Sequence, residues 1–290
     1  MAVPCEFTKF AVGDWQILAR KQIWNAKLQG EVLARTEAQA PARHPQTIAL
    51  SHIIDGVEQE VFLKVFHRRS LAAAVKDQLR RSRALGSWRQ GMALAAAGFN
   101  APSAIAVGVE LGWRVARREF ILTEKVTGLA LTEYLREVAA AQAVPVALKR
   151  EGIRRLARLI RRFHDAGFVH GDLIAANIFV ERVDATGDEF YFMDNDRTRQ
   201  YPVWLRPPFW KRNLIQLNRM PLPGISLQDR MRFLHEYLNL KRLSKTDRQF
   251  ARWLEARTRQ RRQECDGADP SGSFRRLMRW SPELADAKTG

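Results

Sequence analysis

Cysteine is scarce in this chain of 290 residues, and the two that occur form neither a disulfide framework nor a metal motif. Cys5 and Cys265 lie near opposite ends of the sequence, and no second ligand stands at metal-binding spacing from either. A disulfide-stabilised secreted scaffold and a zinc module are therefore excluded. A reducing compartment such as the cytosol is the expected environment.

Long apolar runs are also missing. The most apolar long stretch, Met92 to Trp113, is interrupted by Asn100, Pro102, Ser103 and Glu110, which a lipid-spanning helix does not tolerate well. The first ten residues include Glu6 and lack a long apolar segment, so no secretory signal is predicted. Any encounter with a membrane is expected at its surface.

Acidic residues are too few to balance the basic ones. The sequence holds 48 Lys plus Arg against 31 Asp plus Glu, a net charge of +17 that favours polyanionic partners. The basic residues occur in groups, for example Arg80, Arg81 and Arg83; Arg154, Arg155, Arg158, Arg161 and Arg162; and Arg257, Arg259, Arg261 and Arg262. Each group alone is also compatible with a solvated helical face. Together they suggest nucleic acid, an anionic membrane or a phosphorylated glycolipid as partner.

The remaining composition is that of a globular protein. Hydrophobic residues make up 46% and charged residues 27%, which excludes a wholly disordered chain. No recognition helix, zinc module or aromatic RNA-binding platform is evident, so no specific nucleic-acid binding is expected. At this length one large domain or two packed lobes are both possible.

The order of predicted elements indicates an α+β protein. Strand signals at 47–54 and 57–66 flank Asp55-Gly56 and predict a β-hairpin whose second strand carries Lys64. A helix is predicted over 71–97, ending at Gly98, and further strands over 104–109 and 118–126. From Leu131 onward the pattern is mainly helical, which places a boundary near Gly128.

Oxygen-bearing side chains cluster after the helix predicted over 146–166. The sequence there is Val169-His170-Gly171-Asp172-Leu173-Ile174-Ala175-Ala176-Asn177, and after a turn-rich stretch comes Phe192-Met193-Asp194-Asn195-Asp196-Arg197. Phosphoryl transfer needs a carboxylate that orients the attacking hydroxyl and oxygen ligands that hold Mg²⁺ against the phosphates. Asp172 suits the first task, and Asn177 and Asp194 suit the second.

The pattern H-G-D-L-x-x-x-N, followed by an apolar strand and D-N-D, resembles the catalytic and metal-binding loops of the protein-kinase-like superfamily. Within it, the chain is most similar to the bacterial lipopolysaccharide core kinases, the Kdo and heptose kinase family. The segments that carry this similarity are 163–172, 193–197 and the run Arg212-Asn213-Leu214-Ile215-Gln216-Leu217-Asn218-Arg219. The resemblance implies a two-lobed protein-kinase-like fold, with a strand-rich N-lobe at 1–127 and a mainly helical C-lobe at 128–290.

The resemblance also implies roles for individual residues, with ATP and Mg²⁺ as cofactors. Lys64 is then the strand lysine that binds the nucleotide phosphates, Asp172 the catalytic base, and Asn177 and Asp194 the Mg²⁺ ligands. The backbone from Glu124 to Val126 is the expected hinge that pairs with adenine. His164 and His170, which stand among aromatic and apolar residues, are expected to be structural.

The chain departs from the superfamily pattern in several places. Gly171 stands where regulated protein kinases carry an arginine that pairs with a phosphorylated activation loop, so that control is expected to be absent. No Ala-Pro-Glu element follows Asp194, and the stretch 198–210 is short and rich in Pro and Trp, and both features favour a substrate other than a protein. Ser87 occupies the position where the family places the helix glutamate that pairs with Lys64, and Asp77 is the only acid in the predicted helix. No G-x-G-x-x-G is present, so no phosphate-covering glycines are assigned.

The leading hypothesis is an ATP- and Mg²⁺-dependent kinase that phosphorylates a sugar hydroxyl of the lipopolysaccharide core or of a lipid A precursor. It is expected in the cytoplasm, peripheral at the inner membrane, where the basic surface meets anionic lipid. A small-molecule kinase of the aminoglycoside or choline type is the alternative enzyme. Its acceptors are usually cationic and would call for an acidic pocket, and the basic excess of this chain argues against it. A pseudokinase scaffold at the membrane surface is the alternative without catalysis, motivated by Ser87.

Overall fold

The computed structural model describes residues 6–42, 45–54, 56–67, 82–111, 118–140, 146–183, 187–202, 204, 206–219, 224–240 and 242–267. The chain forms two compact units. The first extends to Val126 and includes Asn195–Arg197, and the second comprises 127–194 and the chain from 198 onward. The predicted α+β fold class, with an N-terminal antiparallel sheet and a helical C-terminal part, is confirmed.

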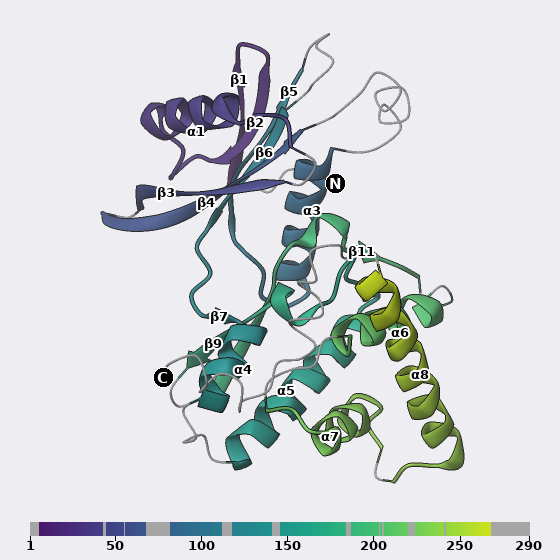
Figure 1. Cartoon of the computed structure of the whole chain (residues 1–290). Coiled ribbons are helices and arrows are strands. Elements are labelled where there is room, and N and C mark those ends of the chain that lie inside the picture. The colour runs from purple at the N-terminus through teal and green to yellow at the C-terminus, as the bar shows by residue number, and fades with distance from the viewer. Residues whose placement is uncertain are drawn as a thin grey trace. The chain divides into compact units, whose positions relative to one another are not determined.

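The first unit is built on a six-stranded antiparallel sheet of order β1-β2-β5-β6-β4-β3 (Figure 1). Its strands are β1 (Phe7–Val12), β2 (Trp15–Arg20), β3 (Gln46–Ile54), β4 (Val57–His67), β5 (Ala104–Glu110) and β6 (Arg118–Glu124). The predicted hairpin corresponds to β3 and β4, where Gly56 has φ +81°; Asp55 lies outside the described residues. The hairpin of β1 and β2 was not foreseen from the sequence.

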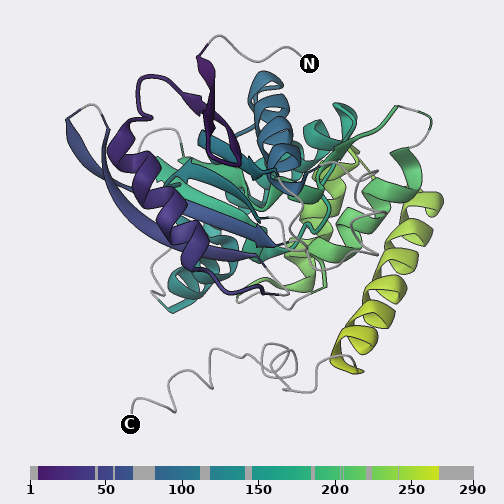
Figure 2. The ribbon, with the colours of Figure 1, turned by 90° about the horizontal axis from the view of Figure 1, so that it is seen from above.

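Strand alternation gives the two faces of this sheet different roles. Val61, Leu63 and Val65 on β4 are fully buried and contribute to a core that includes side chains of helix α1 (Ala26–Ala38). Figure 2 shows α1 lying across the strands. Lys64 and Phe66, which alternate with these residues, point to the opposite face, because successive side chains of a strand alternate.

Helix α3 (Arg83–Ala96) covers that opposite face, and Phe66 packs there with buried residues of the helix. The helix begins after Ser82, whose hydroxyl accepts a hydrogen bond from the Leu85 N–H, as an N-cap serine does. It ends before Gly98, which has φ +74°. The helix predicted over 71–97 is confirmed from Arg83 onward, and residues 71–81 lie outside the described part of the chain.

The second unit is mainly helical. Its helices are α4 (Leu131–Ala140), α5 (Val146–Asp165), α6 (Arg206–Leu217), α7 (Leu227–Tyr237) and α8 (Lys245–Gly267). Its short strands are β7 (Leu129–Ala130), β8 (Phe168–Val169), β9 (Ile178–Val183), β10 (Gly187–Phe192) and β11 (Arg199–Gln200), with 3-10 turn η1 (Ala175–Asn177) before β9. The turn η2 (Asn195–Arg197) belongs to the first unit.

An aromatic core holds β8 and β10 against α5. Phe163 of α5 is fully buried, and its ring centroid lies 4.4 Å from that of Phe192 and 5.5 Å from that of Phe168. Because β8 precedes the predicted catalytic loop and β10 precedes Met193, this core fixes the starting points of both loops. Among the described helices, none combines the length and apolar composition needed to cross a bilayer.

Candidate active site

Backbone and side-chain hydrogen bonds bring three of the predicted site residues together in the second unit. The Asn177 side-chain Nδ2 donates to the backbone carbonyl of Asp172 at 2.9 Å. The Met193 N–H in turn donates to the backbone carbonyl of Asn177, also at 2.9 Å. Since Met193 immediately precedes Asp194, the loop of Asp172 and Asn177 and the loop of Asp194 are joined at their adjacent ends.

His170 makes a second connection between the same loops. Its Nδ1 accepts a hydrogen bond from the Asp172 N–H at 3.1 Å, and its Nε2 lies 2.8 Å from the Met193 carbonyl. A backbone N–H can only donate and a carbonyl can only accept, so the ring is the tautomer protonated on Nε2. The side chain is 1% exposed. The expected structural role of His170 is confirmed.

Asn213 of α6 holds the start of the predicted catalytic loop. Its Nδ2 donates to the His170 carbonyl at 2.7 Å and its Oδ1 accepts the His170 N–H at 3.0 Å, which fixes the orientation of the amide. The same Oδ1 lies 3.2 Å from His164 Nε2, so His164 must donate there. The second nitrogen of His164, Nδ1, then accepts from the Tyr237 hydroxyl at 2.8 Å.

Burial keeps His164 neutral. Desolvation lowers the pKa of His164 to about 4, against smaller opposing contributions from the Asn213 hydrogen bond and the Asp165 charge. Burial also raises the pKa of the Tyr237 hydroxyl, so that this group remains a hydrogen-bond donor. The expected structural role of His164 is confirmed: it supports Asn213, which supports the loop.

Gln216, one turn after Asn213 on α6, contacts the carboxylate of Asp172. Its Nε2 lies 3.2 Å from Asp172 Oδ1 and 3.3 Å from the Gly171 carbonyl, while its Oε1 accepts the Asn213 Nδ2 at 2.9 Å. Neither Asn213 nor Gln216 is assigned a role by the sequence alone. Two buried amides at i and i+3 on an amphipathic helix were the available signal, because buried amides need polar partners.

The backbone at Asp194 has an unusual conformation. Its φ is +55°, in the left-handed region that aspartate tolerates better than most residues. The turn η2 follows directly, and its residues Asn195 and Asp196 are buried. The chain therefore leaves the second unit immediately after Asp194 and enters the first for three residues.

Asp196 is held in the first unit by Arg83, the first residue of α3. The Arg83 Nε donates to Asp196 Oδ2 at 3.1 Å, and the Nη2 forms an ion pair with the same oxygen. The Arg83 guanidinium also lies 4.9 Å from the centroid of the Phe66 ring. One arginine thus connects the turn after Asp194, the helix and strand β4.

Lys64 lies on β4 in the first unit, on the face that α3 covers. Its Nζ is 5.4 Å from the centroid of the Phe66 ring. The cross-strand partner of Phe66 on β6 is Glu119, and that of Lys64 is Ile121, so Lys64 and Glu119 are diagonal neighbours on one face. Glu119 is 1% exposed. A buried carboxylate therefore lies on the lysine's face of the sheet although Ser87 replaces the helix glutamate.

Glu119 also secures the start of α3. Its Oε2 accepts hydrogen bonds from the Ser82 hydroxyl at 2.9 Å and from the Ala84 N–H at 3.1 Å. A carboxylate at a helix N-terminus is favoured by the helix dipole as well as by the free N–H groups. The strand β6 thus supplies the acidic group that positions the helix.

The predicted hinge residues end the first unit. The Glu124 N–H donates to the Ser103 carbonyl at 2.9 Å, and its carboxylate pairs with Arg20 at 2.8 Å. Lys125 is fixed to Glu60 both by its backbone N–H and by its side chain. Val126 is the last residue of the unit. Lys64, Glu124 and Val126 therefore share one unit, and Asp172, Asn177 and Asp194 share the other.

The donor set at Asn177 and Asp194 suits a hard cation. The Nδ2 of Asn177 is turned to the Asp172 carbonyl, which leaves Oδ1 directed away from that carbonyl. Amide and carboxylate oxygens are ligands that Mg²⁺ accepts, with substrate phosphates completing its shell. Within the described ranges, no group of three or more His, Cys, Asp or Glu side chains could hold a metal ion by itself.

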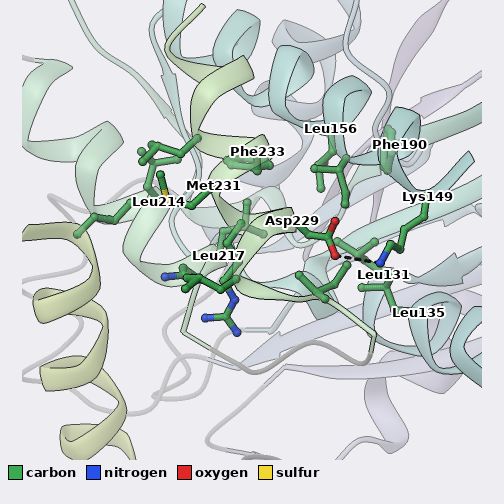
Figure 3. Close-up of a pocket in the computed structure, with 18 of the residues that line it drawn as sticks. Leu131, Leu135, Lys149, Leu156, Phe190, Leu214, Leu217, Asp229, Met231 and Phe233 are labelled. Atoms are coloured by element: carbon green, nitrogen blue, oxygen red, sulfur yellow. Dashed lines mark hydrogen bonds and ion pairs between the residues drawn. The ribbon is translucent and has the colours of Figure 1, made fainter. Parts of the chain in front are cut away.

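A separate apolar cavity of about 190 Å³ lies inside the second unit (Figure 3). Leucine and aromatic side chains from several helices and from β10 line it, among them Leu131, Leu135, Leu156, Phe190, Leu214 and Leu217. Lys149 and Asp229 form an ion pair at 2.9 Å in its wall. Such a cavity is suited to an apolar group.

Comparisons with known proteins agree with these observations. The model of the lipopolysaccharide kinase (Kdo/WaaP) family matches residues 46–237. A curated relative, 3-deoxy-D-manno-octulosonic acid kinase from Actinobacillus succinogenes, is 32% identical over 142 residues, which cover 49% of this chain and 54% of the relative. The chain thus spans about half the length of this curated relative.

A solved structure, "WaaP in complex with acyl carrier protein", is similar with a TM-score of 0.55 and 20% sequence identity. The similarity covers 78% of this chain and 91% of that one. At this identity the similarity bears on the fold, which it places among kinase-like structures.

Proposed function

Because this chain belongs to the lipopolysaccharide kinase (Kdo/WaaP) family, we propose that it transfers the γ-phosphoryl group of ATP to a sugar hydroxyl of the lipopolysaccharide inner core. The observation that carries the proposal is the pair of hydrogen bonds that joins Asp172 to Asn177 and Asn177 to Met193, next to Asp194. They gather one carboxylate for the hydroxyl and two oxygen ligands for a metal. Phosphoryl transfer asks for little more from a protein than this positioning.

In the proposed reaction, Asp172 accepts the proton of the attacking sugar hydroxyl. Gln216 and His170 hold the Asp172 side chain and backbone, so the carboxylate is oriented before the acceptor arrives. Asn177 and Asp194 would hold Mg²⁺. The ion, when bound, neutralises charge on the phosphate oxygens.

The first unit supplies the proposed nucleotide contacts. Lys64 would bind the phosphates, and the backbone of Glu124 and Val126 would pair with adenine. Fully buried residues flank Lys64 on β4 and fix the backbone from which its side chain extends. The Glu124 N–H already donates to Ser103, so among the donors at these two residues the Val126 N–H is the one proposed for adenine.

The proposed acceptor is an anionic sugar of the lipopolysaccharide core or of a lipid A precursor. The similar curated protein is named for 3-deoxy-D-manno-octulosonic acid, a sugar acid. The net charge of +17 favours such an acceptor and the anionic membrane that carries it. We therefore place the protein at the cytoplasmic surface of the inner membrane, as a peripheral protein.

The direct test is phosphate transfer from radiolabelled ATP, with Mg²⁺, to a lipid A precursor that carries 3-deoxy-D-manno-octulosonic acid. The wild-type protein is expected to label the lipid, and Asp172→Ala is expected to lower kcat by about 10²- to 10⁴-fold, the usual contribution of a general base. Asp165→Ala is the control, because that aspartate pairs with Arg161 on the surface of α5. Unchanged transfer by Asp172→Ala would show that Asp172 is not the catalytic base.

The same assay separates the two alternatives. A panel of aminoglycosides and choline tests the small-molecule kinase, and labelling of these in preference to the lipid would establish it. Binding of Mg-ATP measured by calorimetry, without transfer to either class of acceptor, would establish the pseudokinase. We favour the active enzyme because Glu119 supplies a buried carboxylate on the face of the sheet that carries Lys64.

The apolar cavity of the second unit supports a second candidate role, the binding of an acyl group. The similar WaaP structure was solved in complex with acyl carrier protein, and a leucine-lined cavity of about 190 Å³ accepts a hydrocarbon chain without burying unpaired polar groups. Acylated and unacylated carrier protein, compared in a pull-down with the wild-type chain and with Leu156→Trp, test this role. Equal capture of both forms by both proteins would contradict it.

A further inference from the structure

Basic side chains gather where the carboxyl end of α6 meets α8. The Arg262 Nε donates to the Arg219 carbonyl at 2.7 Å, and its Nη2 donates to the Asn218 carbonyl at 2.8 Å. These bonds satisfy the carbonyls of the two residues that directly follow α6. They also fix α8 so that Arg261 and Cys265 lie close to the end of α6.

This arginine group lies next to Asp172. The Arg219 N–H donates to the Gln216 carbonyl at 3.2 Å, so the chain completes another turn after Gln216. Residues three apart in such a turn lie on the same side, and Gln216 itself contacts the Asp172 carboxylate. The hydrogen bond with Glu264 chiefly raises the pKa of Arg261, and the negative charge of Asp172 is among the smaller contributions in the same direction.

Arg219 carries an unsatisfied polar atom. Its Nε is buried without a hydrogen-bond partner among the described residues, and its Nη1 reaches Cys265 Sγ at 3.6 Å, which is a weak acceptor. A buried guanidinium N–H that finds no protein acceptor is costly and calls for an explanation, such as a ligand. The planar donors of arginine match carboxylate and phosphate oxygens.

The surrounding charges favour an anion. Burial is the first cause that lowers the pKa of Arg262, and repulsion from Arg230 and Arg259 acts in the same direction. Glu255 and Glu264 are the acids that face this group from α8. Five arginines therefore stand against two glutamates and Asp172 in this region, and an anionic ligand reduces the mutual repulsion of the arginines.

We propose that Arg219 and Arg261 form an anion-binding subsite beside Asp172, which holds a carboxylate or phosphate group of the acceptor. This inference rests on the proposed kinase function and adds the residues that select the acceptor. Arg262 is a positioning residue, because its guanidinium donates to the Asn218 and Arg219 carbonyls. The subsite places the acceptor's charged group so that a neighbouring hydroxyl meets the Asp172 carboxylate.

The primary test is Arg261→Gln, because this side chain is half exposed and its loss is expected to leave the fold intact. We expect the KM for the lipid acceptor to rise about 10- to 100-fold, the value of one or two charge-assisted hydrogen bonds, while the KM for ATP stays unchanged. Arg219→Gln is expected to act in the same direction, and Arg261→Lys to recover part of the affinity. Arg252→Gln, an exposed arginine of α8, removes the same charge and is expected to have no effect.

Two outcomes would overturn the subsite. An unchanged acceptor KM in both Arg261→Gln and Arg219→Gln would show that neither arginine touches the acceptor. A rise in the KM for ATP instead would assign the arginines to the nucleotide phosphates. Thermal unfolding of each variant, measured by circular dichroism, identifies a change that comes from loss of folded protein.

Acceptor analogues distinguish the two sources of the anion. The wild type is expected to prefer the free acid of the acceptor over its methyl ester, or the phosphorylated lipid acceptor over the dephosphorylated one. We expect this preference to disappear in Arg261→Gln. Retention of both preferences would overturn the proposal. Equilibrium binding of the same lipids to Asp172→Asn, with and without Arg261→Gln, needs no turnover. It therefore tests the subsite even if wild-type transfer, and with it the proposed function, fails.

Discussion

Arg83 of α3 is ion-paired with Asp196, two residues after Asp194 in the chain. The Asp196 side chain is 3% exposed, so its charge is removed from water and depends on the arginine. The same guanidinium lies over the ring of Phe66, which shares a strand face with Lys64. Ser87 stands where the superfamily has a helix glutamate, and an arginine of the same helix holds Asp196, in the turn that follows the proposed metal ligand Asp194.

Arg83→Ala is predicted to lower kcat by at least about 10-fold, because Asp194 loses the support of the turn that follows it. It is also predicted to destabilise the protein by about 1–3 kcal/mol, since the Asp196 carboxylate remains buried without its arginine. The double variant Arg83→Asp with Asp196→Arg is expected to recover part of the activity. Activity and urea unfolding of the single and double variants give the coupling energy, and a coupling of zero would contradict the pairing.

Gln216→Leu is predicted to lower kcat more than it changes the KM for ATP. The substitution keeps the side-chain volume but removes the donor to Asp172 Oδ1 and leaves the Asn213 amide with one partner fewer. We expect a fall in kcat of about 10-fold, the value of one hydrogen bond to a charged group. Gln216→Glu is the second variant to measure. It would place a second carboxylate beside Asp172, which should raise the pKa of Asp172 and shift the pH profile of kcat to higher pH.

Much of the fold was predictable because local signals coincide with the final structure. The β3–β4 hairpin, the helix that ends at Gly98 and the two loops around Asp172 and Asp194 each carry a motif or a periodicity that does not depend on distant residues. The residues that support the site were harder to predict from the sequence. Asn213 and Gln216 act on residues more than 40 positions away, and no local pattern states which loop a buried amide will reach.

Ser87 shows that a residue missing from a motif can mislead when only the sequence is compared. Reading the helix alone predicts that Lys64 has lost its acidic neighbour. The register of β4 against β6 places Glu119 diagonally across from Lys64. The two residues are 55 positions apart in the sequence, so only the strand pairing reveals the relationship. A missing residue in a motif is therefore weak evidence for an inactive protein until the pairing of the strands is known.

Glu119→Gln is predicted to raise the KM for ATP while leaving the protein folded. The glutamine carbonyl can still accept the hydrogen bonds of Ser82 and Ala84, but the negative charge on the face of Lys64 is lost. We expect a change of about 10-fold, typical of one charge interaction at a partly desolvated site. Glu119→Leu removes the helix contacts as well, and should lower the unfolding free energy by about 1–3 kcal/mol. Unaltered nucleotide affinity in Glu119→Gln would restrict the residue to a structural role.

The buried imidazole of His164 predicts a specific loss of stability in weak acid. Its pKa in the folded protein is about 4, because burial disfavours the charged ring, against 6.5 for an ordinary histidine. The unfolded chain therefore binds a proton first as the pH falls. The stabilisation is fully present above pH 6.5 and declines between pH 6.5 and 4, by up to about 1.4 kcal/mol per pH unit.

Urea unfolding at pH 7, 6 and 5 measures this decline, and His164→Gln is the matched variant. The glutamine can still donate to Asn213 Oδ1, but it carries no titrating group, so the variant is expected to be less stable at pH 7 and to lose less on acidification. Other histidines titrate in both proteins and cancel in the difference. Parallel stability curves for the two proteins would show that folding does not lower the pKa of His164. A charged ring would donate from both nitrogens, so the Tyr237 hydroxyl would then accept from Nδ1, while Asn213 Oδ1 would still accept from Nε2.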